Sequence, residues 1–367
     1  MKRILYLSRG GSIGGSQRQF YYLVTELEHS YEPIVVCTKD GPFFNKLRDH
    51  DISTYILPMH PWRKFPAGLY RYWDAERIVM LGKKYEVALV HSSDLWLTGY
   101  MIWVARKLQI PSVLHVRTPI STRDVRKHNC NQATKIIAIS RQIRRNLLCA
   151  GIPPRKITRI HDSVNLGIFK PIENNKNALR REFSKLGNVL VGLVGRIDPS
   201  KRQLAFLQAA EQVIKNCTKN ITFLLIGEVH HLGYFKLLKQ FVSERGLNKQ
   251  VVFTERQDDI PRVLNSLDIL VSLSGGSVMF EAAACGKTVI LAKIDGDQNY
   301  RLTKFVQSRP IVLATGTSDL VEALIRLINN SRLRKQIGWK SRKWAESSFC
   351  HFAMAAKTQK LYEKLLL

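Results

Sequence analysis

The stretch Ser266–Lys293 constrains the fold more than any other part of the chain. Two apolar runs rich in β-branched residues, Ile269–Leu273 and Thr288–Ala292, have the length and composition of buried strands. Between them, Val278–Cys285 has the pattern of a short helix that ends at a glycine. Because two parallel strands need a crossover connection, usually a helix, this order predicts a parallel sheet.

The turn in front of that helix, Ser274–Ser277, contains two adjacent glycines. Backbone N–H groups and the positive end of a helix dipole at such a turn favour an anion. Glu281 follows about one helical turn later, where a carboxylate would repel a phosphate but accept hydrogen bonds from sugar hydroxyls. The alternative is a solvated glutamate beside a glycine pair that only packs, and this stretch alone leaves both interpretations open.

The chain length, 367 residues, leaves room for about two domains. No apolar run approaches the roughly 18 residues of a membrane span, and the longest, Leu95–Ala105, predicts a core helix. The first residues lack the profile of a signal peptide, and the six cysteines are scattered singly without metal-ligand spacing. We therefore expect a cytoplasmic protein with reduced thiols and no metal site.

The formal net charge is +28, and it is spread over the whole chain. Residues 1–168 hold 26 Lys and Arg against 12 Asp and Glu, and the remaining residues hold 31 against 17, so each half has an excess of 14. The charge is densest in Arg117–Arg159, with eleven basic residues and one acid. An anionic substrate or membrane surface fits this charge, whereas no nucleic-acid-binding motif is present. The alternative is a basic surface that only maintains solubility.

The N-terminal residues predict a strand, Arg3–Leu7, a glycine-rich loop, Ser8–Ser16, and a helix, Gln17–Leu27. The loop matches neither the dinucleotide-binding fingerprint nor the P-loop. Gly14 and Gly15 at the helix start suit the close approach of an anionic or sugar ligand, although a plain tight turn is an equal alternative.

His115 stands near the end of a further predicted strand, Ser112–Val116. Open α/β sheets bind their ligands at the carboxyl ends of their strands, and Arg117-Thr118-Pro119 leaves the sheet at once. This predicts that His115 lies at the rim of the sheet, where it could act on a ligand, although a lone strand histidine is more often structural.

An aromatic and basic segment, Pro61–Trp73, lies between two predicted strands, Ile52–Leu57 and Val87–Val90. Trp62, Phe65 and Trp73 together with three basic residues could settle at a lipid interface. A partly buried loop and helix is the alternative.

A second sheet is predicted to begin at Val189–Val194, after linker-like residues 162–176. Arg196 and Lys201 follow this strand and precede a predicted helix, Arg202–Lys215. An arginine and a lysine five residues apart at a strand-to-helix turn can bind one diphosphate, the arginine as a fork and the lysine as a point charge. We expect two domains, residues 1–168 and 169–351, with the terminal helix 352–367 packed back on the first.

Several motifs, taken together and in order, resemble one enzyme family. These motifs are GGS (14–16), the strand-end His115, IAIS (137–140), VGRIDPSK (194–201), LIGE (225–228) and EAAACGK (281–287). In order and spacing the chain resembles the GT-B glycosyltransferases of family 4, which are retaining and use nucleotide sugars. The resemblance implies an α/β fold of two facing Rossmann-like domains with a cleft between them.

Site residues follow from this resemblance position by position. Arg196 and Lys201 match the pair that neutralises the donor diphosphate, and His115 matches the active-site histidine near the transferred sugar. The donor-binding positions are Gly14, Gly15, Gly276, Ser277, Val278 and Glu281. Glu281 matches the glutamate that holds the ribose. At the position of a second glutamate, eight residues earlier, this chain has Leu273.

The resemblance implies a retaining, metal-independent transfer of sugar from a nucleotide-diphosphate sugar to a polysaccharide, lipopolysaccharide or lipid-linked acceptor. A nucleotide-sugar epimerase or phosphorylase with the same architecture is an alternative, and Leu273 adds a catalytically silent sugar-nucleotide-binding protein. The expected partners are the nucleotide sugar, a glycan or lipid-linked acceptor and an anionic membrane surface, with the protein peripheral on its inner face.

Overall fold

The computed structural model describes residues 1–11, 13–64, 66–118, 120–172, 178–184, 189–255, 257–294 and 309–367. The chain divides into two compact units, the first formed by residues 1–163 and 351–367 and the second by residues 164–350. The division therefore lies after residue 163 rather than after residue 168, because Val164 already pairs with Cys350 in the second unit. Of the predicted linker, residues 173–176 lie outside the described residues.

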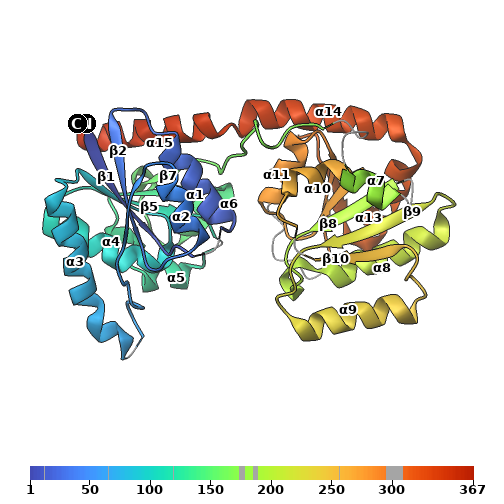
Figure 1. Ribbon diagram of the computed structural model, residues 1–367, viewed down its shortest axis with the longest axis horizontal. Helices are drawn as coiled ribbons and strands as arrows, with labels where there is room; N and C mark the ends of the chain where they lie inside the picture. The colour runs from blue at the N-terminus through green and yellow to red at the C-terminus, as the bar shows by residue number, and fades with distance from the viewer. Residues whose placement is uncertain are drawn as a thin grey trace. The chain divides into compact units, whose positions relative to one another are not determined.

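The first unit is built on a parallel sheet of seven strands in the order β3-β2-β1-β4-β5-β6-β7 (Figure 1). The strands are β1 (Lys2–Ser8), β2 (Tyr31–Cys37), β3 (Ser53–Ile56), β4 (Leu89–Ser92), β5 (Ser112–Val116), β6 (Lys135–Ala138) and β7 (Ile157–Arg159). The helices are α1 (Gly15–Thr25), α2 (Pro42–Arg48), α3 (Arg71–Lys84), α4 (Thr98–Leu108), α5 (Thr122–Lys127), α6 (Arg141–Cys149) and α15 (His351–Leu366).

Alternate residues of these strands enter two separate hydrophobic clusters, one on each face of the sheet. On β1, Leu5 and Leu7 pack with α3, α4, α5 and α6, whereas Ile4 and Tyr6 pack with α1, α2 and α15. A strand buried on both faces reads as a continuous apolar run, which is why RILYL predicted it correctly. The C-terminal helix α15 thus closes one face of the first unit through residues such as Met354 and Tyr362.

The second unit has a parallel sheet of six strands in the order β10-β9-β8-β11-β12-β13. The strands are β8 (Val189–Val194), β9 (Ile221–Ile226), β10 (Val251–Thr254), β11 (Ile269–Ser272), β12 (Thr288–Lys293) and β13 (Val312–Thr315). The helices are α7 (Ala178–Ser184), α8 (Gln203–Asn216), α9 (Leu232–Glu244), α10 (Ile260–Ser266), α11 (Ser277–Ala284), α13 (Gly316–Asn329) and α14 (Ser331–Ser348). Helices α8, α9 and α13 cover one face, and α7, α10, α11 and α14 cover the other.

Some helices and strands begin at other residues than the sequence predicted. Helix α8 begins at Gln203 because Arg202 has a left-handed conformation with φ of 60°. Helix α1 begins at Gly15, two residues before the predicted start, with Gly14 as its N-cap. Strand β4 begins at Leu89 rather than at Val87.

Trp62 is partly buried and packs against the core of the first unit, which fits the alternative of a partly buried loop and helix. Its ring lies 4.8 Å from the ring of Tyr100, and it lies against Gly99 so closely that an added Cβ there would come within 2.4 Å of it. Its carbonyl oxygen accepts a hydrogen bond of 2.7 Å from Arg71. Phe65 lies outside the described residues, whereas Trp73 is strongly exposed.

No helix in the described ranges is both long and apolar enough to cross a membrane.

Gly227 permits a backbone contact that positions the loop after β8. An added Cβ would lie 2.2 Å from the carbonyl oxygen of Gly195, and φ is 152°. We therefore expect Gly227→Ala to lower the free energy of unfolding by at least about 2 kcal/mol, measured by urea denaturation. The control is Gly246→Ala, where φ is 65° but nothing lies within 4 Å, so only a backbone cost of about 1 kcal/mol is expected. Equal losses for both variants would show that crowding is not what requires Gly227.

Candidate donor and acceptor sites

The donor-binding residues predicted in the second unit lie in two loops that follow neighbouring strands. Strands β8 and β11 pair directly, with Ile269 opposite Val191. Since parallel strands end at the same edge, the loop after β8 and the loop after β11 are neighbours. Lys201 comes from the first loop, and its Nζ donates a hydrogen bond of 3.3 Å to Oγ of Ser274 in the second.

Arg196 and Lys201 place two positive charges close together. Burial lowers the pKa of Lys201, and the Arg196 guanidinium lowers it further. The Asp198 carboxylate offsets this effect in part, but within the described ranges neither cation has a carboxylate at ion-pair distance. Two neighbouring cations without such a partner repel each other, and a bound dianion would relieve this repulsion.

The loop that carries Lys201 is held by its own hydrogen bonds. The Asp198 carboxylate accepts from the backbone N–H of Ser200 at 2.9 Å and from its hydroxyl at 2.5 Å. The side chain of Gln203 donates to the carbonyl oxygen of Arg196 at 2.7 Å. These hydrogen bonds restrain the turn that carries Arg196 and Lys201, which reduces the conformational entropy lost when a ligand binds.

Helix α11 supplies the third component of this site. Gly276 is its N-cap with φ of 112°, Gly275 has φ of 67°, and no side chain caps the helix. No atom lies within 4 Å of an added Cβ at Gly276, so its backbone conformation, not crowding, favours glycine there. The first helical residues, Ser277 and Val278, thus present N–H groups where an anion is favoured.

Glu281 is buried, with 5% of its surface exposed, so the alternative of a solvated helix glutamate is wrong. It lies on the second turn of α11, between the buried residues Met279 and Ala282. Leu273 is also buried and packs in the hydrophobic cluster between the sheet and α8. Its side chain belongs to the core, so nothing at this position offers a sugar a hydrogen bond.

Gly14, Gly15 and His115 all belong to the first unit, at the carboxyl edge of its sheet. Gly14 and Gly15 are exposed at the start of α1, and Gly14 has an extended conformation. The glycines that the backbone requires are Gly10 and Gly11, with φ of 66° and 80°, in the same loop.

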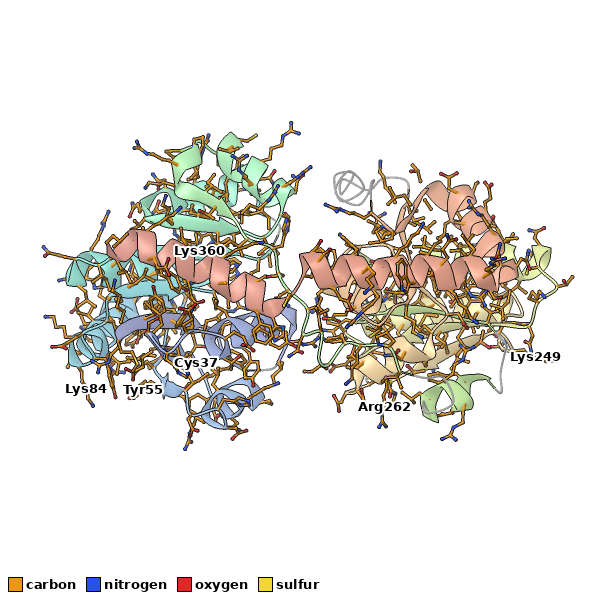
Figure 2. All side chains as sticks on the ribbon, turned by 90° about the horizontal axis from the view of Figure 1, so that it is seen from above. Cys37, Tyr55, Lys84, Lys249, Arg262 and Lys360 are labelled. Atoms are coloured by element: carbon orange, nitrogen blue, oxygen red, sulfur yellow. The ribbon has the colours of Figure 1, made fainter. Side chains whose placement is uncertain are left out.

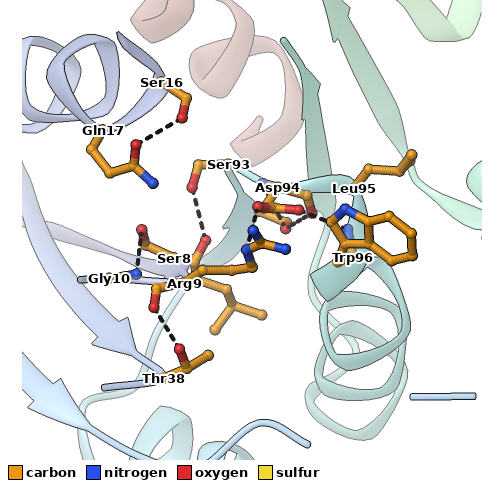
Figure 3. A network of polar contacts seen from close by, with 12 residues as sticks. Ser8, Arg9, Gly10, Ser16, Gln17, Thr38, Ser93, Asp94, Leu95 and Trp96 are labelled. Carbon is orange, nitrogen blue, oxygen red and sulfur yellow. Dashed lines mark hydrogen bonds and ion pairs between the residues drawn. The ribbon is translucent and has the colours of Figure 1, made fainter. Parts of the chain in front are cut away.

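Polar contacts tie this loop to the end of β4, as Figure 3 shows. The Arg9 guanidinium lies 3.1 Å from the Asp94 carboxylate, and Ser93 donates to the carbonyl oxygen of Leu7 at 3.1 Å. Asp94 also caps the turn after β4 by accepting from the N–H of Trp96 at 2.9 Å. Sequence reasoning missed Arg9 and Asp94, because their pairing depends on β1 and β4 being neighbours.

His115 lies next to the carboxyl end of β5, where the sequence placed it, and it is buried, with 1% of its surface exposed. Arg117 approaches its Nδ1 at 3.2 Å and is itself paired with Asp162. A guanidinium can only donate, so Nδ1 accepts and the ring hydrogen is on Nε2. Arg117 follows β5 directly, two residues after His115, and this spacing places both side chains on the same side of the extended chain.

A second histidine, His91, lies beside the first with ring centroids 5.5 Å apart. Its Nδ1 is 2.5 Å from the hydroxyl of Tyr362, which is 3.0 Å from that of Tyr6. Burial lowers the pKa of His91 to about 3 and holds that of His115 well below its usual value, with Arg117 adding to both effects. Both rings are therefore neutral near pH 7, and His115 offers a donor, not a transferable proton.

In the part of the chain that the structure describes, no group of three or more His, Cys, Asp or Glu residues could hold a metal ion.

Comparison with known proteins identifies the class. A family model described as "Glycosyltransferase Family 4" matches residues 13–167, and one described as "Glycosyl transferases group 1" matches residues 175–344. The crystal structure of Anabaena HepE in complex with UDP and glucose superposes with a TM-score of 0.84 at 21% identity and covers 100% of both chains. The protein therefore belongs to the GT-B glycosyltransferases.

The names of two curated relatives indicate a substrate or a biosynthetic pathway. The Escherichia coli UDP-Gal:alpha-D-GlcNAc-diphosphoundecaprenol alpha-1,3-galactosyltransferase is 22% identical over 323 residues, which cover 82% of this chain and 80% of the relative. The Staphylococcus aureus capsular polysaccharide biosynthesis glycosyltransferase CapH is 24% identical over 285 residues, which cover 74% and 72%.

The buried histidines predict how stability depends on pH. Below about pH 6.5 the unfolded chain protonates His91, whereas the folded chain does so only near pH 3, so stability falls as the pH drops through this window. His91→Asn, which keeps an acceptor for Tyr362, should remove up to about 1.4 kcal/mol per pH unit from that slope. Urea midpoints at pH 7, 6, 5 and 4 measure it, with the exposed His29→Asn as control. An unchanged slope in His91→Asn would contradict the assignment of a neutral ring.

Proposed function

We propose that the protein is a retaining glycosyltransferase that moves a sugar from a nucleotide-diphosphate sugar to a polysaccharide, lipopolysaccharide or lipid-linked acceptor. One observation carries the donor half of this proposal. Lys201 bonds to Ser274 beside Arg196, in front of the uncapped N-terminus of α11, so that two cations and a helix end lie together. The printed names of the relatives support the choice of substrates, since one acts on a diphosphoundecaprenol-linked sugar and one in capsule biosynthesis.

The chemistry that these residues would serve is the departure of the diphosphate. When the bond between the sugar carbon and the diphosphate oxygen breaks, negative charge develops on that oxygen. Cations and N–H groups already aimed at this position stabilise the charge without reorganising. Arg196, Lys201 and the start of α11 would do this in place of a metal ion, so we propose a metal-independent reaction.

The remaining residues take binding roles. Glu281, buried on α11, would accept hydrogen bonds from the ribose hydroxyls, and Gly276, Ser277 and Val278 would approach the diphosphate with their backbone. His115 would lie near the transferred sugar, with Gly14 and Gly15 at the glycine loop of the same unit. Because Leu273 is in the core, the sugar would be held without the second glutamate of the family pattern.

Product analysis distinguishes this proposal from its alternatives. A transferase releases a nucleoside diphosphate and a glycoside, whereas an epimerase returns an altered sugar nucleotide and a binding protein returns none. The anomeric configuration of the glycoside, read by NMR, tests retention. We further propose that the protein works as a cytoplasmic enzyme, peripheral on an anionic membrane surface.

Arg196 is expected to bind the diphosphate of the donor. Arg196→Ala should lose about 2–4 kcal/mol of transition-state stabilisation, because a preorganised charge in the site is removed. Turnover is measured at saturating donor, with Arg332→Ala, an exposed arginine of α14, as the control. If Arg196→Ala turns over like the parent, the diphosphate is bound elsewhere.

Glu281 is expected to bind the ribose of the donor. Glu281→Gln keeps the shape of the side chain but removes its charge, so nucleoside diphosphate binding should weaken by roughly tenfold. Calorimetric titration measures the affinity, circular dichroism verifies the fold, and Glu244→Gln on the exposed side of α9 is the control. Unaltered affinity in a folded Glu281→Gln variant would mean that Glu281 has only a structural role.

A further inference from the structure

The segment from Leu69 to Met80 carries an unusual concentration of exposed apolar side chains. Leu69 is 67% exposed, Trp73 71% and Met80 66%, and Tyr70 lies beside Trp73 with ring centroids 6.1 Å apart. They belong to the short 3-10 helix η1 (Ala67–Tyr70) and to α3, which follows it directly. Exposed apolar residues scattered singly need no explanation, but a group on one element marks an interaction surface.

The helical repeat aligns these side chains with basic ones. At 100° per residue, Trp73, Arg77, Met80 and Lys84 fall on one stripe of α3, about 16 Å long. Asp74, Ala75, Ile78, Val79 and Gly82 form the opposite, buried side. Helix α3 therefore has one apolar side that packs on the sheet and a second, mixed apolar and basic stripe that does not.

The charge around this stripe is positive. Arg63, Lys64 and Lys83 are also exposed, and Figure 2 shows Lys84 at the periphery of the first unit. Both acids of α3 are already engaged. Asp74 is buried against His60 at 2.7 Å, and Glu76 accepts a hydrogen bond of 2.9 Å from Trp103 and lies 3.6 Å from Lys107.

We propose that this α3 surface docks the protein on an anionic lipid bilayer. It consists of Leu69, Tyr70, Trp73, Arg77, Met80 and Lys84. Tryptophan, tyrosine and leucine side chains settle at the headgroup level while lysine and arginine attract acidic lipids, which is the composition of an interfacial helix. A protein partner would also fit apolar side chains, but the excess of exposed cations over acids on this part of the first unit favours a uniformly anionic surface.

Docking through the α3 surface rests on the membrane association proposed above and assigns the residues responsible for it. It is independent of the proposed glycosyl transfer, since neither α3 nor η1 carries a residue assigned to that reaction. The experiment accordingly omits donor and acceptor. Flotation measures binding to vesicles of phosphatidylcholine with phosphatidylglycerol, and to phosphatidylcholine alone, at low and high salt.

The variants use a matched pair of tryptophans. Trp339 is 63% exposed on α14, whose exposed side is also basic, so it resembles Trp73 in exposure and in charged surroundings but belongs to the second unit. We expect Trp73→Ala to weaken binding to anionic vesicles by at least about fivefold, and Trp339→Ala to leave it unchanged. Arg77→Gln with Lys84→Gln should weaken binding by roughly twentyfold, whereas Lys335→Gln with Lys340→Gln on α14 should not. Unchanged thermal unfolding verifies that each variant is folded.

Several outcomes would overturn the proposal. Binding of the parent to neither vesicle, or equally to both, excludes docking on an anionic surface. Equal losses for Trp73→Ala and Trp339→Ala, or a loss for Trp339→Ala alone, would mean that the α3 surface is not the site. Binding that persists in high salt would show that the cations do not contribute.

Discussion

The direct pairing of β8 with β11 is the constraint on which the candidate donor site depends. The two strands are far apart in the sequence, with β9 and β10 between them, yet they lie side by side because the strand order reverses at β8. Their following loops therefore meet at one edge of the sheet. Without this pairing, Lys201 would not reach Ser274, and the N-terminus of α11 would have no cations beside it. Gly192 of β8 leaves room for the side chain of Leu267, which precedes β11, since an added Cβ at Gly192 would come within 2.6 Å of it.

The first unit has the same kind of reversal in strand order, but the side chains at its sheet edge have different chemistry. Its strand order reverses at β1, whose neighbour β4 brings His91 and Asp94 to the same edge as the glycine loop. In this unit, burial determines the protonation state of the histidine side chains. His115 and His91 are kept neutral by the low-dielectric interior and by the Arg117 charge. One sheet thus has two cations in the loop at its carboxyl edge, and the other has two buried, neutral histidines near its carboxyl edge.

In the aromatic and basic segment Pro61–Trp73, packing buries some residues and exposes others that look equivalent in the sequence. Trp62 and Trp73 both lie among basic residues, but Trp62 fills the space left by Gly99 and meets the Tyr100 ring edge to face. Trp73 falls on the side of α3 that faces away from the sheet. Arg71 reinforces the division, because it bonds to the carbonyl oxygen of Trp62 and stacks on Tyr72 at 4.7 Å. Composition alone indicates an interface, whereas helical phase decides which side chains can form it.

The sequence by itself determined the class of the fold and the chemical types of the site residues. Apolar runs such as RILYL and VLVGLV, separated by glycine turns and helical patterns, specify buried parallel strands. Arg196, Lys201 and the glycines before α11 were visible because diphosphate binding needs those residue types at strand-to-helix turns. Only the tertiary structure decided strand order, and with it the Lys201–Ser274 contact, the Arg9–Asp94 pair and the partnership of Tyr362 with His91. It also decided burial, which encloses His115 at its strand end and rules out a solvated Glu281. The physical reason is that residue type and spacing report local periodicity, whereas neighbours and burial follow from contacts between segments far apart in the chain.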